Sequence, residues 1–479
     1  MSHSSPAILG TFKVPEIHNE PMRSYPPGSE DRAKLKAALH ELKAAAPIEI
    51  PVYVNGEEIR TGRIVEQRIP SDHKTVLAKY HEADSSIVEK AIKGALAAEI
   101  DAAAELVDFW RFNCKYASEI YQQQPPKNAP GVWNRVEYRP LEGFVYAISP
   151  FNFTAIGGNL PSAPALMGNV ILWKPSPNAA LSNWIIMEIL KEAGLPDGVI
   201  QFIPGHAQEI TDQILKSPDF ASLHFTGSTF VFKKLWKEIG NNIDIYKSYP
   251  RIVGETGGKN FHVIHESASV KNAVNQTIRG AFEYQGQKCS ACSRAYVPDS
   301  LWDNFRENLL SELSKVKVGP MDEFGNFVGP VIHAASFEKI KGYIEWAKSD
   351  ADCQIISGGT YDNSKGYFVD PTVIVTKNPK SRTMCEEIFG SHNLCANEYE
   401  QILDLAKETS PYALTGSIFA KDRSAILLGE SKLRHASGNF YINDKSTGAI
   451  VGQQPFGGSR ASGTNDKAGS PALVIIVGI

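Results

Sequence analysis

The chain has 479 residues, of which 42% are hydrophobic, 21% charged and 10% aromatic, as in an ordinary globular protein. This length exceeds what one simple core holds and predicts about two or three domains. A formal net charge of −4 without a run of Lys or Arg excludes nucleic acid as a partner, and no apolar stretch approaches the roughly 20 residues of a membrane span.

The N-terminal region predicts two helices and a strand. Residues 31–46 are typical of a surface helix, and residues 48–54 of a strand. Residues 99–122 carry apolar side chains at helical spacing and predict a longer helix. The proline-rich segment 124–130 is expected to end it.

From residue 143 onward, apolar strands alternate with helices. The expected strands are 144–149, 170–173, 199–203, 222–225 and 261–264, and the expected helices run to about 167 and over 181–193, 207–216, 229–239 and 269–284. Such alternation predicts a doubly wound parallel sheet. Sheets of this kind bind ligands at the carboxyl ends of their strands.

A second alternating series follows residue 290. The expected strands are 294–297, 354–356, 368–376, 414–419 and 439–442, and the expected helices are 301–314, 335–349 and 422–434. This series predicts a second α/β domain.

The six cysteines are expected to be reduced thiols, because the chain is long and shows no secretory signal. Cys289 and Cys292 form a C-x-x-C pair, but no second pair or nearby histidines complete a zinc site, so no metal is expected. The N-terminus lacks an apolar core and its first arginine is Arg23, so the sequence itself shows no mitochondrial presequence.

Two glycine-bearing motifs predict a catalytic pair. Cys289 follows Gly286-Gln287-Lys288, and Glu255 lies in Gly254-Glu255-Thr256-Gly257-Gly258. A free cysteine with a pKa of about 8.5 is mostly protonated at neutral pH, so a nucleophilic Cys289 needs a neighbouring base or cation. The alternatives are a buried hydrophobic cysteine and a solvated loop glutamate.

Three further motifs each leave two interpretations open. Phe225-Thr226-Gly227-Ser228 lies at a strand-to-helix junction, which suits either a dinucleotide phosphate or a plain turn. Lys174, just past a strand, suits either a ribose contact or a surface lysine. Asn152, in an apolar loop, suits either an oxyanion donor or an ordinary turn.

Taken in order, these motifs resemble the aldehyde dehydrogenase superfamily, whose pattern continues through residues 387–390 and 455–458. Residues 438–448 and 451–458 look more narrowly like the 1-pyrroline-5-carboxylate dehydrogenase branch. The likeness runs from about residue 14 to 468.

The resemblance implies an aldehyde dehydrogenase-like α/β fold with a Rossmann-type NAD-binding domain, an α/β catalytic domain and a small oligomerisation segment. The boundaries expected from it are 1–285 for the N-terminal arm and NAD-binding domain, with an oligomerisation hairpin at 123–142, then 286–445 for the catalytic domain and 446–479 for a substrate-anchor loop and altered C-terminal segment. It also implies a homodimer or higher homo-oligomer, in the mitochondrial matrix or alternatively the cytoplasm.

The implied activity is NAD-dependent oxidation of L-glutamate γ-semialdehyde to L-glutamate in proline catabolism. By this likeness Cys289 attacks the aldehyde, Asn152 holds the oxyanion and Glu255 activates the hydrolytic water. The implied NAD contacts are Ser149, Lys174, Gly227, Ser228, Thr229, Phe230, Val231, Glu387 and Phe389. The implied substrate contacts are Glu105, Ser290, Gly448, Ala449 and Phe456.

Three departures from the family pattern predict gaps in the scaffold. Residues 97–99 join two helical segments where the family has several more turns, the residues after Gly390 lack the expected hydrophobic strand, and residues 471–479 do not resemble the family's C-terminal segment. Two alternatives follow: a shortened variant that is inactive, poorly folded or at most a binding protein, and a related semialdehyde dehydrogenase.

Overall fold

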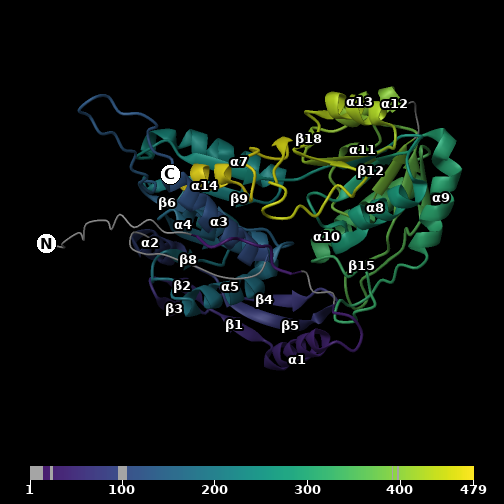
Figure 1. Ribbon diagram of the computed structural model, residues 1–479. Helices are drawn as coiled ribbons and strands as arrows, with labels where there is room; N and C mark the ends of the chain where they lie inside the picture. The colour runs from purple at the N-terminus through teal and green to yellow at the C-terminus, as the bar shows by residue number, and fades with distance from the viewer. Residues whose placement is uncertain (1–13, 22–24, 95–104, 391, 396–398, 479) are drawn as a thin grey trace.

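The computed structural model describes residues 14–21, 25–94, 105–390, 392–395 and 399–478. Two seven-stranded sheets form two units that lie side by side, and the chain passes from the first to the second and returns at its C-terminus (Figure 1).

In the first unit the strands are β1 (Ile48–Ile50), β2 (Val52–Val54), β3 (Glu57–Ile59), β4 (Ile64–Ile69), β5 (Asp72–His81), β6 (Phe144–Ile148), β7 (Val170–Lys174), β8 (Ile200–Phe202), β9 (Phe220–Thr226) and β10 (Arg251–Glu255). The helices are α1 (Glu30–Ala45), α2 (Ser85–Gly94), α3 (Glu105–Tyr121), α4 (Thr154–Leu166), α5 (Ala180–Glu192), α6 (Ala207–Ile214) and α7 (Thr229–Asn241), with short 3₁₀ turns η1 (Pro177–Ala179) and η2 (Ile243–Ile245).

The first seven-stranded sheet has the order β10-β9-β6-β7-β8-β2-β3 and is parallel from β10 to β8. Alternate residues of its central strands serve two separate cores, as the two-residue period of a strand requires. Val145 and Trp173 pack with Leu160 of α4, whereas Tyr146 and Leu172 face the core on the other side of the sheet. Helices therefore cover both faces, which confirms the predicted doubly wound sheet.

The strand expected at 48–54 is two strands in different sheets. β1 pairs with β5 in a small three-stranded sheet of order β1-β5-β4, and β2 pairs with β3 and β8 in the large sheet. Pro51 separates them, because proline has no N–H to donate to a ladder. The long hairpin of β4 and β5 lies largely at the surface, with polar and charged residues between its apolar ones, and gave no strand prediction.

In the second unit the strands are β11 (Asn260–Ile264), β12 (Cys292–Tyr296), β13 (Cys353–Ser357), β14 (Tyr361–Asp362), β15 (Phe368–Val369), β16 (Val373–Thr376), β17 (His392–Cys395), β18 (Tyr412–Ala413), β19 (Thr415–Phe419), β20 (Asn439–Ile442) and β21 (Ser459–Arg460). The helices are α8 (Val270–Phe282), α9 (Asp299–Leu313), α10 (Ala334–Ser349), α11 (Arg382–Cys385), α12 (Tyr399–Glu408) and α13 (Arg423–Leu433), with a short turn η3 (Glu283–Gly286). The last helix, α14 (Pro471–Gly478), follows them in the chain.

The expectation of a missing strand after Gly390 is wrong. β17 occupies the interior of the second large sheet, whose order is β13-β16-β17-β12-β11-β19-β20, and it pairs in parallel with both β16 and β12. The prediction rested on the polar residues of this stretch, which are unusual for a buried strand. Backbone pairing on both sides is nevertheless available to any residue that has an N–H and a C=O. The strand expected at 368–376 is likewise divided, at Asp370-Pro371, into β15 and β16.

Sheet membership changes between β10 and β11. β11 pairs with β12 and β19 of the second sheet, and α8 packs against α9 and β12. The two sheets thus divide the chain between Glu255 and Asn260, upstream of the boundary expected at residue 285.

The C-terminal segment returns to the first unit as a helix. α14 packs against α3, α4 and β10, with Leu473 and Val474 buried (Figure 1). Val474 joins Ile120 of α3 and Met167 in one apolar cluster. The segment unlike the family pattern is therefore part of the packed structure.

Residues 123–142, expected as a hairpin, contain no strand. Their backbone is irregular and stands out from the body as a loop between α3 and β6 (Figure 1). Side chains hold its two legs together: the Gln124 amide oxygen accepts from the Val136 N–H at 3.0 Å, and the Tyr138 hydroxyl donates to the Gln123 carbonyl at 3.0 Å. Of the helix expected at 99–122, the described part begins at Glu105 as α3, and the junction at residues 97–99 lies outside the described residues.

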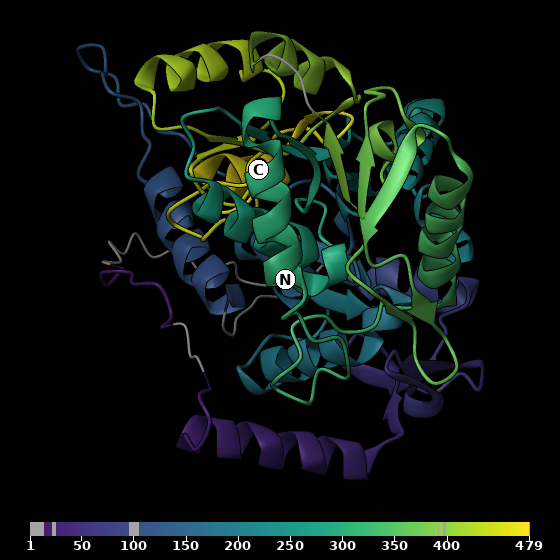
Figure 2. The same cartoon turned by 90° about the vertical axis from the view of Figure 1, so that its right-hand side faces the viewer.

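Helix α1 lies along the edge of the molecule, below the rest in the rotated view (Figure 2). It contains no buried residue. The Arg32 guanidinium lies 4.6 Å from the centroid of the Phe324 ring, and Lys43 forms an ion pair with Asp322. These contacts tie the N-terminal helix to a loop of the second unit.

Candidate active site

Three parallel strands end at the edge of the first sheet where the predicted catalytic residues gather. In the β6–β9 and β9–β10 pairings, Ile148 lies opposite Phe225, and Thr226 lies opposite Glu255. The loops that follow these strands therefore start side by side. This register brings the segments of Asn152, Gly227 and Glu255 together.

Cys289 is held in a loop that follows an unusual turn. Tyr284, Gln285 and Gly286 have φ values of 58°, 59° and 69°, so three consecutive residues adopt left-handed backbone. At Gly286 an added Cβ would lie 2.7 Å from the Gly390 carbonyl oxygen, so only glycine fits. After the turn, Asn260 Nδ2 donates to the carbonyls of Cys289 at 2.7 Å and Ala291 at 2.8 Å.

The Asn152 carboxamide lies against the same loop. Its Nδ2 donates to the Gln287 carbonyl at 2.8 Å, two residues before Cys289. An amide nitrogen carries two N–H groups, so the second can serve another acceptor. The structure thus brings Asn152 to the nucleophile loop in a form suited to an oxyanion.

The Glu255 carboxylate is surrounded by glycines. The Gly458 N–H lies 3.2 Å from each of its oxygens, and added Cβ atoms at Gly457 and Gly463 would lie 2.9 and 3.2 Å from Oε1. Burial raises the pKa of Glu255 well above its ordinary value, while the Gly458 bond and the nearby Lys467 ammonium oppose the rise. A carboxyl with a raised pKa is an effective general base near neutral pH.

The surroundings of the Cys289 thiol disfavour its charged thiolate form in this structure. Burial, followed by the negative charges of Glu255 and Glu387, raises its pKa to about 12. The resting side chain is therefore a thiol, and forming the thiolate requires a base or a cationic group in the site.

Lys174 is buried, which excludes the surface-lysine interpretation. Only 4% of the residue is exposed, and its Nζ donates to the Pro175 carbonyl at 2.9 Å. Burial lowers its pKa to about 8. The Ser149 hydroxyl is also buried, where it donates to the Asn183 amide oxygen and accepts from the Trp173 indole N–H, each at 3.0 Å. Its bonds are thus made inside the first unit.

The junction of β9 and α7 forms the predicted turn. Gly227 donates its N–H to the Glu255 carbonyl at 3.1 Å, and an added Cβ there would lie 2.7 Å from the Phe225 ring. Ser228 caps α7 by accepting from the Val231 N–H at 3.3 Å. Thr229 Oγ1 donates to the Ala461 carbonyl at 3.3 Å. Phe230 and Val231 are exposed on the first turn.

Glu387 extends across to the loop of the predicted base. Its Oε1 accepts from the Gly258 N–H at 2.7 Å, and burial raises the pKa of its carboxyl. Phe389 has a φ of 67°, and its ring lies edge-on to Phe151 with centroids 6.1 Å apart. These contacts place residues 387–389 beside the Cys289 and Glu255 loops.

The predicted substrate end has two parts. Ser290 Oγ lies 2.7 Å from Thr447 Oγ1, so the nucleophile loop is bonded to residues 446–449, hereafter the anchor loop, which carries Gly448 and Ala449. The half-buried Phe456 donates its N–H to the Ala468 carbonyl at 2.9 Å.

Glu105 belongs to the other part and is the exposed first residue of α3. Partial desolvation raises the pKa of its carboxyl, Asp108 adds a like charge, and Lys288 opposes both. The charge of Lys288, the residue before Cys289, therefore reaches Glu105 across the site.

Sequence reasoning did not identify several residues that shape this site. Asn260 lies two residues after the Gly254–Gly258 motif that carries Glu255, so its position was a usable signal. Asn19 was not, because its Nδ2 donates to Asp108 Oδ2 at 2.9 Å and to the Val451 carbonyl, 432 residues away, at 2.8 Å. Asn19 thereby links α3 to the segment after the anchor loop.

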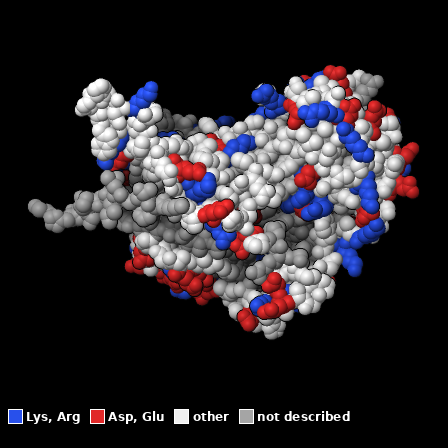
Figure 3. Space-filling view, in the orientation of Figure 1, with Lys and Arg blue, Asp and Glu red and all other residues white. Residues whose placement is uncertain are grey.

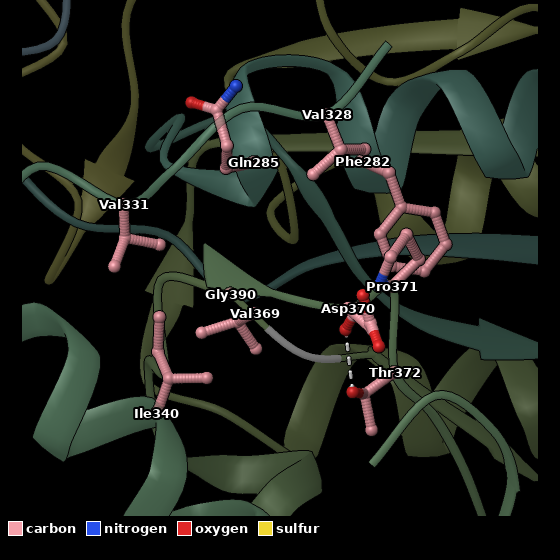
Figure 4. A pocket seen from close by; sticks show the side chains of 10 residues that line it. All are labelled: Phe282, Gln285, Val328, Val331, Ile340, Val369, Asp370, Pro371, Thr372 and Gly390. Atoms are coloured by element: carbon pink, nitrogen blue, oxygen red, sulfur yellow. Dashed lines mark hydrogen bonds between the residues drawn. The ribbon is translucent and has the colours of Figure 1, made fainter. Parts of the chain in front are cut away.

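A small cavity lies behind the catalytic loops. It holds about 20 Å³, close to the space of one water molecule, between Gln285, Ile340, Val369 and Gly390 (Figure 4). The Thr372 hydroxyl donates to the Asp370 carbonyl at 2.8 Å along its wall. The cavity is too small for an organic substrate and adjoins the back of the Tyr284–Gly286 turn.

Charge and metal-ligand arrangements add little to the site. Acidic and basic side chains are interspersed on the face in Figure 3. Among the described residues, no three His, Cys, Asp or Glu side chains form a group that could hold a metal ion. No helix within the residues that the structure describes is both long and apolar enough to cross a membrane.

The fold and this constellation are those of a nucleotide-dependent oxidoreductase, and the comparison with known families agrees on that class. The chain belongs to the aldehyde dehydrogenase family, whose profile matches residues 95–475.

Relatives narrow the likeness. A delta-1-pyrroline-5-carboxylate dehydrogenase of Agaricus bisporus is 53% identical over 98% of this chain and 94% of its own length, and the mitochondrial delta-1-pyrroline-5-carboxylate dehydrogenase of Homo sapiens is 45% identical over 96% and 90%. A crystal structure of the Mycobacterium tuberculosis delta-pyrroline-5-carboxylate dehydrogenase bound with NAD has a TM-score of 0.92 and 41% identity over 97% of this chain and 95% of that one. The A. bisporus alignment spans 518 residues, more than the 479 of this chain, so that relative has residues without a counterpart here.

The residues at the strand ends fit a dinucleotide. A Cβ at Gly227 would close the turn before α7, and the capped N-terminus of this helix can face a phosphate. Lys174 brings a buried amine and Glu387 a partly buried carboxylate, groups that can bond to ribose hydroxyls.

Proposed function

We propose that this chain oxidises L-glutamate γ-semialdehyde, formed from 1-pyrroline-5-carboxylate, to L-glutamate with NAD as the oxidant. The observation that carries the proposal is the hydroxyl–hydroxyl contact of Ser290 and Thr447, which joins the nucleophile loop to the anchor loop. An aldehyde held by its far carboxylate at the anchor loop would present its carbonyl to Cys289. Relatives that carry the corresponding name are 53% and 45% identical to the chain.

The first step is addition of Cys289 to the aldehyde. Loss of the thiol proton to a base allows sulfur to bond to the carbonyl carbon, and the carbonyl π electrons move to oxygen. The free Asn152 N–H and the Cys289 backbone N–H hold that oxyanion. When bound, NAD accepts the hydride that the carbon then loses, and Cys289 is left as a thioester.

The second step is hydrolysis of the thioester. Glu255 removes a proton from a water molecule, which attacks the acyl carbon, and the Cys289 sulfur leaves with the bonding pair. The product is a carboxylate. The raised pKa of Glu255 suits it to this proton transfer near neutral pH.

The chain's own residues define where the partners would bind. For NAD, Lys174 and Glu387 contact ribose hydroxyls, the turn of residues 227–231 faces the phosphates, and Phe389 adjoins the ring. The Ser149 hydroxyl is engaged by Asn183 and Trp173, and its N–H donates to the Lys174 carbonyl at 3.3 Å, so Ser149 offers its carbonyl oxygen for such a contact. For the substrate, Gly448, Ala449 and Ser290 hold the carboxylate, Glu105 faces the ammonium and Phe456 lines the path.

The protein acts as a homo-oligomer in the mitochondrial matrix under this proposal. The exposed Val132 and Trp133 on the loop of residues 123–142 offer an apolar surface to a second copy, and several relatives are named mitochondrial. The inactive-variant alternative assumed a lost strand after Gly390 and an altered C-terminal segment. The structure has strand β17 at the first place and the packed helix α14 at the second.

The test is to purify the chain, verify a cooperative thermal transition, and follow NADH absorbance with 1-pyrroline-5-carboxylate. NADH formation that disappears in Cys289→Ala supports the proposal. A folded protein without Cys289-dependent NADH formation contradicts the enzymatic activity. A higher kcat/KM for short alkyl aldehydes than for the semialdehyde contradicts the substrate assignment alone.

A further inference from the structure

Three cationic side chains converge on one carboxylate next to the anchor loop. Glu283 Oε2 lies 3.0 Å from Lys288 Nζ and 3.2 Å from Lys445 Nζ, and Oε1 lies 2.8 Å from the Arg279 guanidinium. One carboxylate balances one of the three positive charges. The cluster therefore holds more positive than negative charge.

The cluster lies between the two loops that would hold the substrate. Lys288 precedes Cys289, and Lys445 precedes the anchor loop. An added Cβ at Gly448 would lie 2.9 Å from Lys445 Nζ, so this ammonium packs against the backbone of the anchor loop. The charge of Lys445 thus lies beside Gly448 of the anchor loop.

Solvent screens this charge only in part. The side chains of Lys288, Lys445 and Glu283 are 8%, 17% and 17% exposed, whereas Arg279 is at the surface. Two other carboxylates lie nearby: Glu105 interacts with Lys288 from α3, and the solvent-exposed Asp444 accepts from the Lys445 N–H at 2.8 Å. Partly buried surplus charge is costly unless an anion compensates it.

We propose that Lys445 is a specificity-determining residue, whose ammonium selects aldehydes that carry a carboxylate at the end remote from the carbonyl. The inference rests on the proposed function, because it concerns how that substrate's carboxylate is held at the anchor loop. Hydrogen-bond donors alone recognise the shape of a carboxylate, and a neighbouring cation adds preference for its charge. Glu283 holds Lys445 in place, with Lys288 on the same oxygen.

The experiment compares two aldehydes of equal chain length, 5-oxopentanoate and pentanal. In Lys445→Met, kcat/KM for 5-oxopentanoate is expected to fall about 10-fold or more, mainly through a higher KM, while the value for pentanal stays within about twofold. Lys445→Arg is expected to keep most of the preference, because the positive charge remains. Thermal melts of each variant establish that it is folded.

Two further variants separate charge from structure. Lys432→Met is the matched control, since Lys432 of α13 is also largely covered, and its ion pairs, with Glu400 at 2.9 Å and Asp404 at 2.6 Å, are made to α12 and not to the anchor loop. Its kinetics are expected to match those of the wild type. Glu283→Gln removes the balancing negative charge but keeps an amide oxygen that can accept from Lys445, so it is expected to retain or increase the preference for 5-oxopentanoate.

Equal losses with both aldehydes in Lys445→Met would show a purely structural role and overturn the inference, as would no loss with either. A fall in preference in Glu283→Gln in a folded protein would also overturn it. If the wild type favours 5-oxopentanoate through Lys445 but does not oxidise L-glutamate γ-semialdehyde, the proposed function fails and this inference stands.

Discussion

Lys467 is the cation that faces the predicted general base. Its Nζ donates to the carbonyls of Gly438 at 2.8 Å and Gly457 at 2.7 Å, while the next residue, Gly458, donates its N–H to Glu255. Lys467 therefore holds the turn that contacts Glu255 and also places a positive charge near it. Burial raises the pKa of Glu255, and the ammonium limits that rise.

Replacing Lys467 with Met is expected to move the acidic limb of the pH–kcat profile to higher pH. Without the cation the pKa of Glu255 rises further, and because Glu255 acts as a base in its ionised form, hydrolysis is lost at a higher pH than in the wild type. A shift of roughly one pH unit is expected from loss of one partly buried charge. The profile is measured with saturating NAD and aldehyde.

Lys467→Arg serves as the control, because it retains the charge and is expected to keep the wild-type limb. An unmoved limb in Lys467→Met, with activity reduced equally at every pH, would mean that Lys467 acts only by holding the Gly457–Gly458 turn.

The predictability of the site differs from residue to residue. Cys289, Glu255 and Asn152 could be singled out because each lies in a compact local motif next to a strand, and such motifs are visible in sequence. Their catalytic roles stay predictions. Lys467 and Asn19 were missed because their contacts cross long separations, as in the 432 residues between Asn19 and Val451. The burial of Lys174 was also hidden, since it depends on what packs around β7.

At the scale of elements, regular alternation was predictable and interruptions were not. β20 was predicted with its observed bounds, and α7 and α10 to within two residues, because one face of each helix is apolar. Pro51 was read as part of one strand although it divides β1 from β2 between two sheets. β17 was judged absent because sequence reasoning weighed side chains, whereas its place depends on backbone pairing with β12 and β16.

Helix α14 offers a stability test of the C-terminal segment. Leu473 is 3% exposed and packs with Ala163 of α4 and Val253 of β10, whereas Ile475 is 36% exposed. Leu473→Ala is expected to lower the free energy of unfolding by about 2–4 kcal/mol through lost burial and a cavity. Ile475→Ala, on the same helix, is expected to cost less than about 1 kcal/mol.

Chemical denaturation of both variants measures the difference. Equal, small effects would show that α14 is not packed against α3 and α4 in solution.

At the scale of the whole molecule, the two sheets keep the arrangement of a solved relative. They do so although the chain is shorter than its alignment with a similar protein. The TM-score of 0.92 with the M. tuberculosis enzyme covers 97% of this chain. The alignment of 518 residues with the A. bisporus protein exceeds the chain's 479. The chain therefore keeps the overall arrangement of a solved relative although it lacks residues that the A. bisporus protein has.

The loop of residues 123–142 is where the whole molecule is expected to meet a second copy. Trp133 is 75% exposed and Val132 52% exposed at its outer end, and the loop has no strand ladder of its own. Covering the apolar tip of this loop with another protein surface is favourable, because it removes an indole from water. Trp133→Ser is therefore expected to weaken self-association, measured by sedimentation velocity over a range of concentrations. Because the loop lies outside the Cys289 site, kcat per protomer is expected to stay within about twofold.

The exposed loop glutamate Glu137, exchanged for Gln, is the control for a change on the same loop that leaves the apolar tip intact. A Trp133→Ser protein with the same sedimentation coefficient as the wild type at every concentration would place the self-association surface elsewhere.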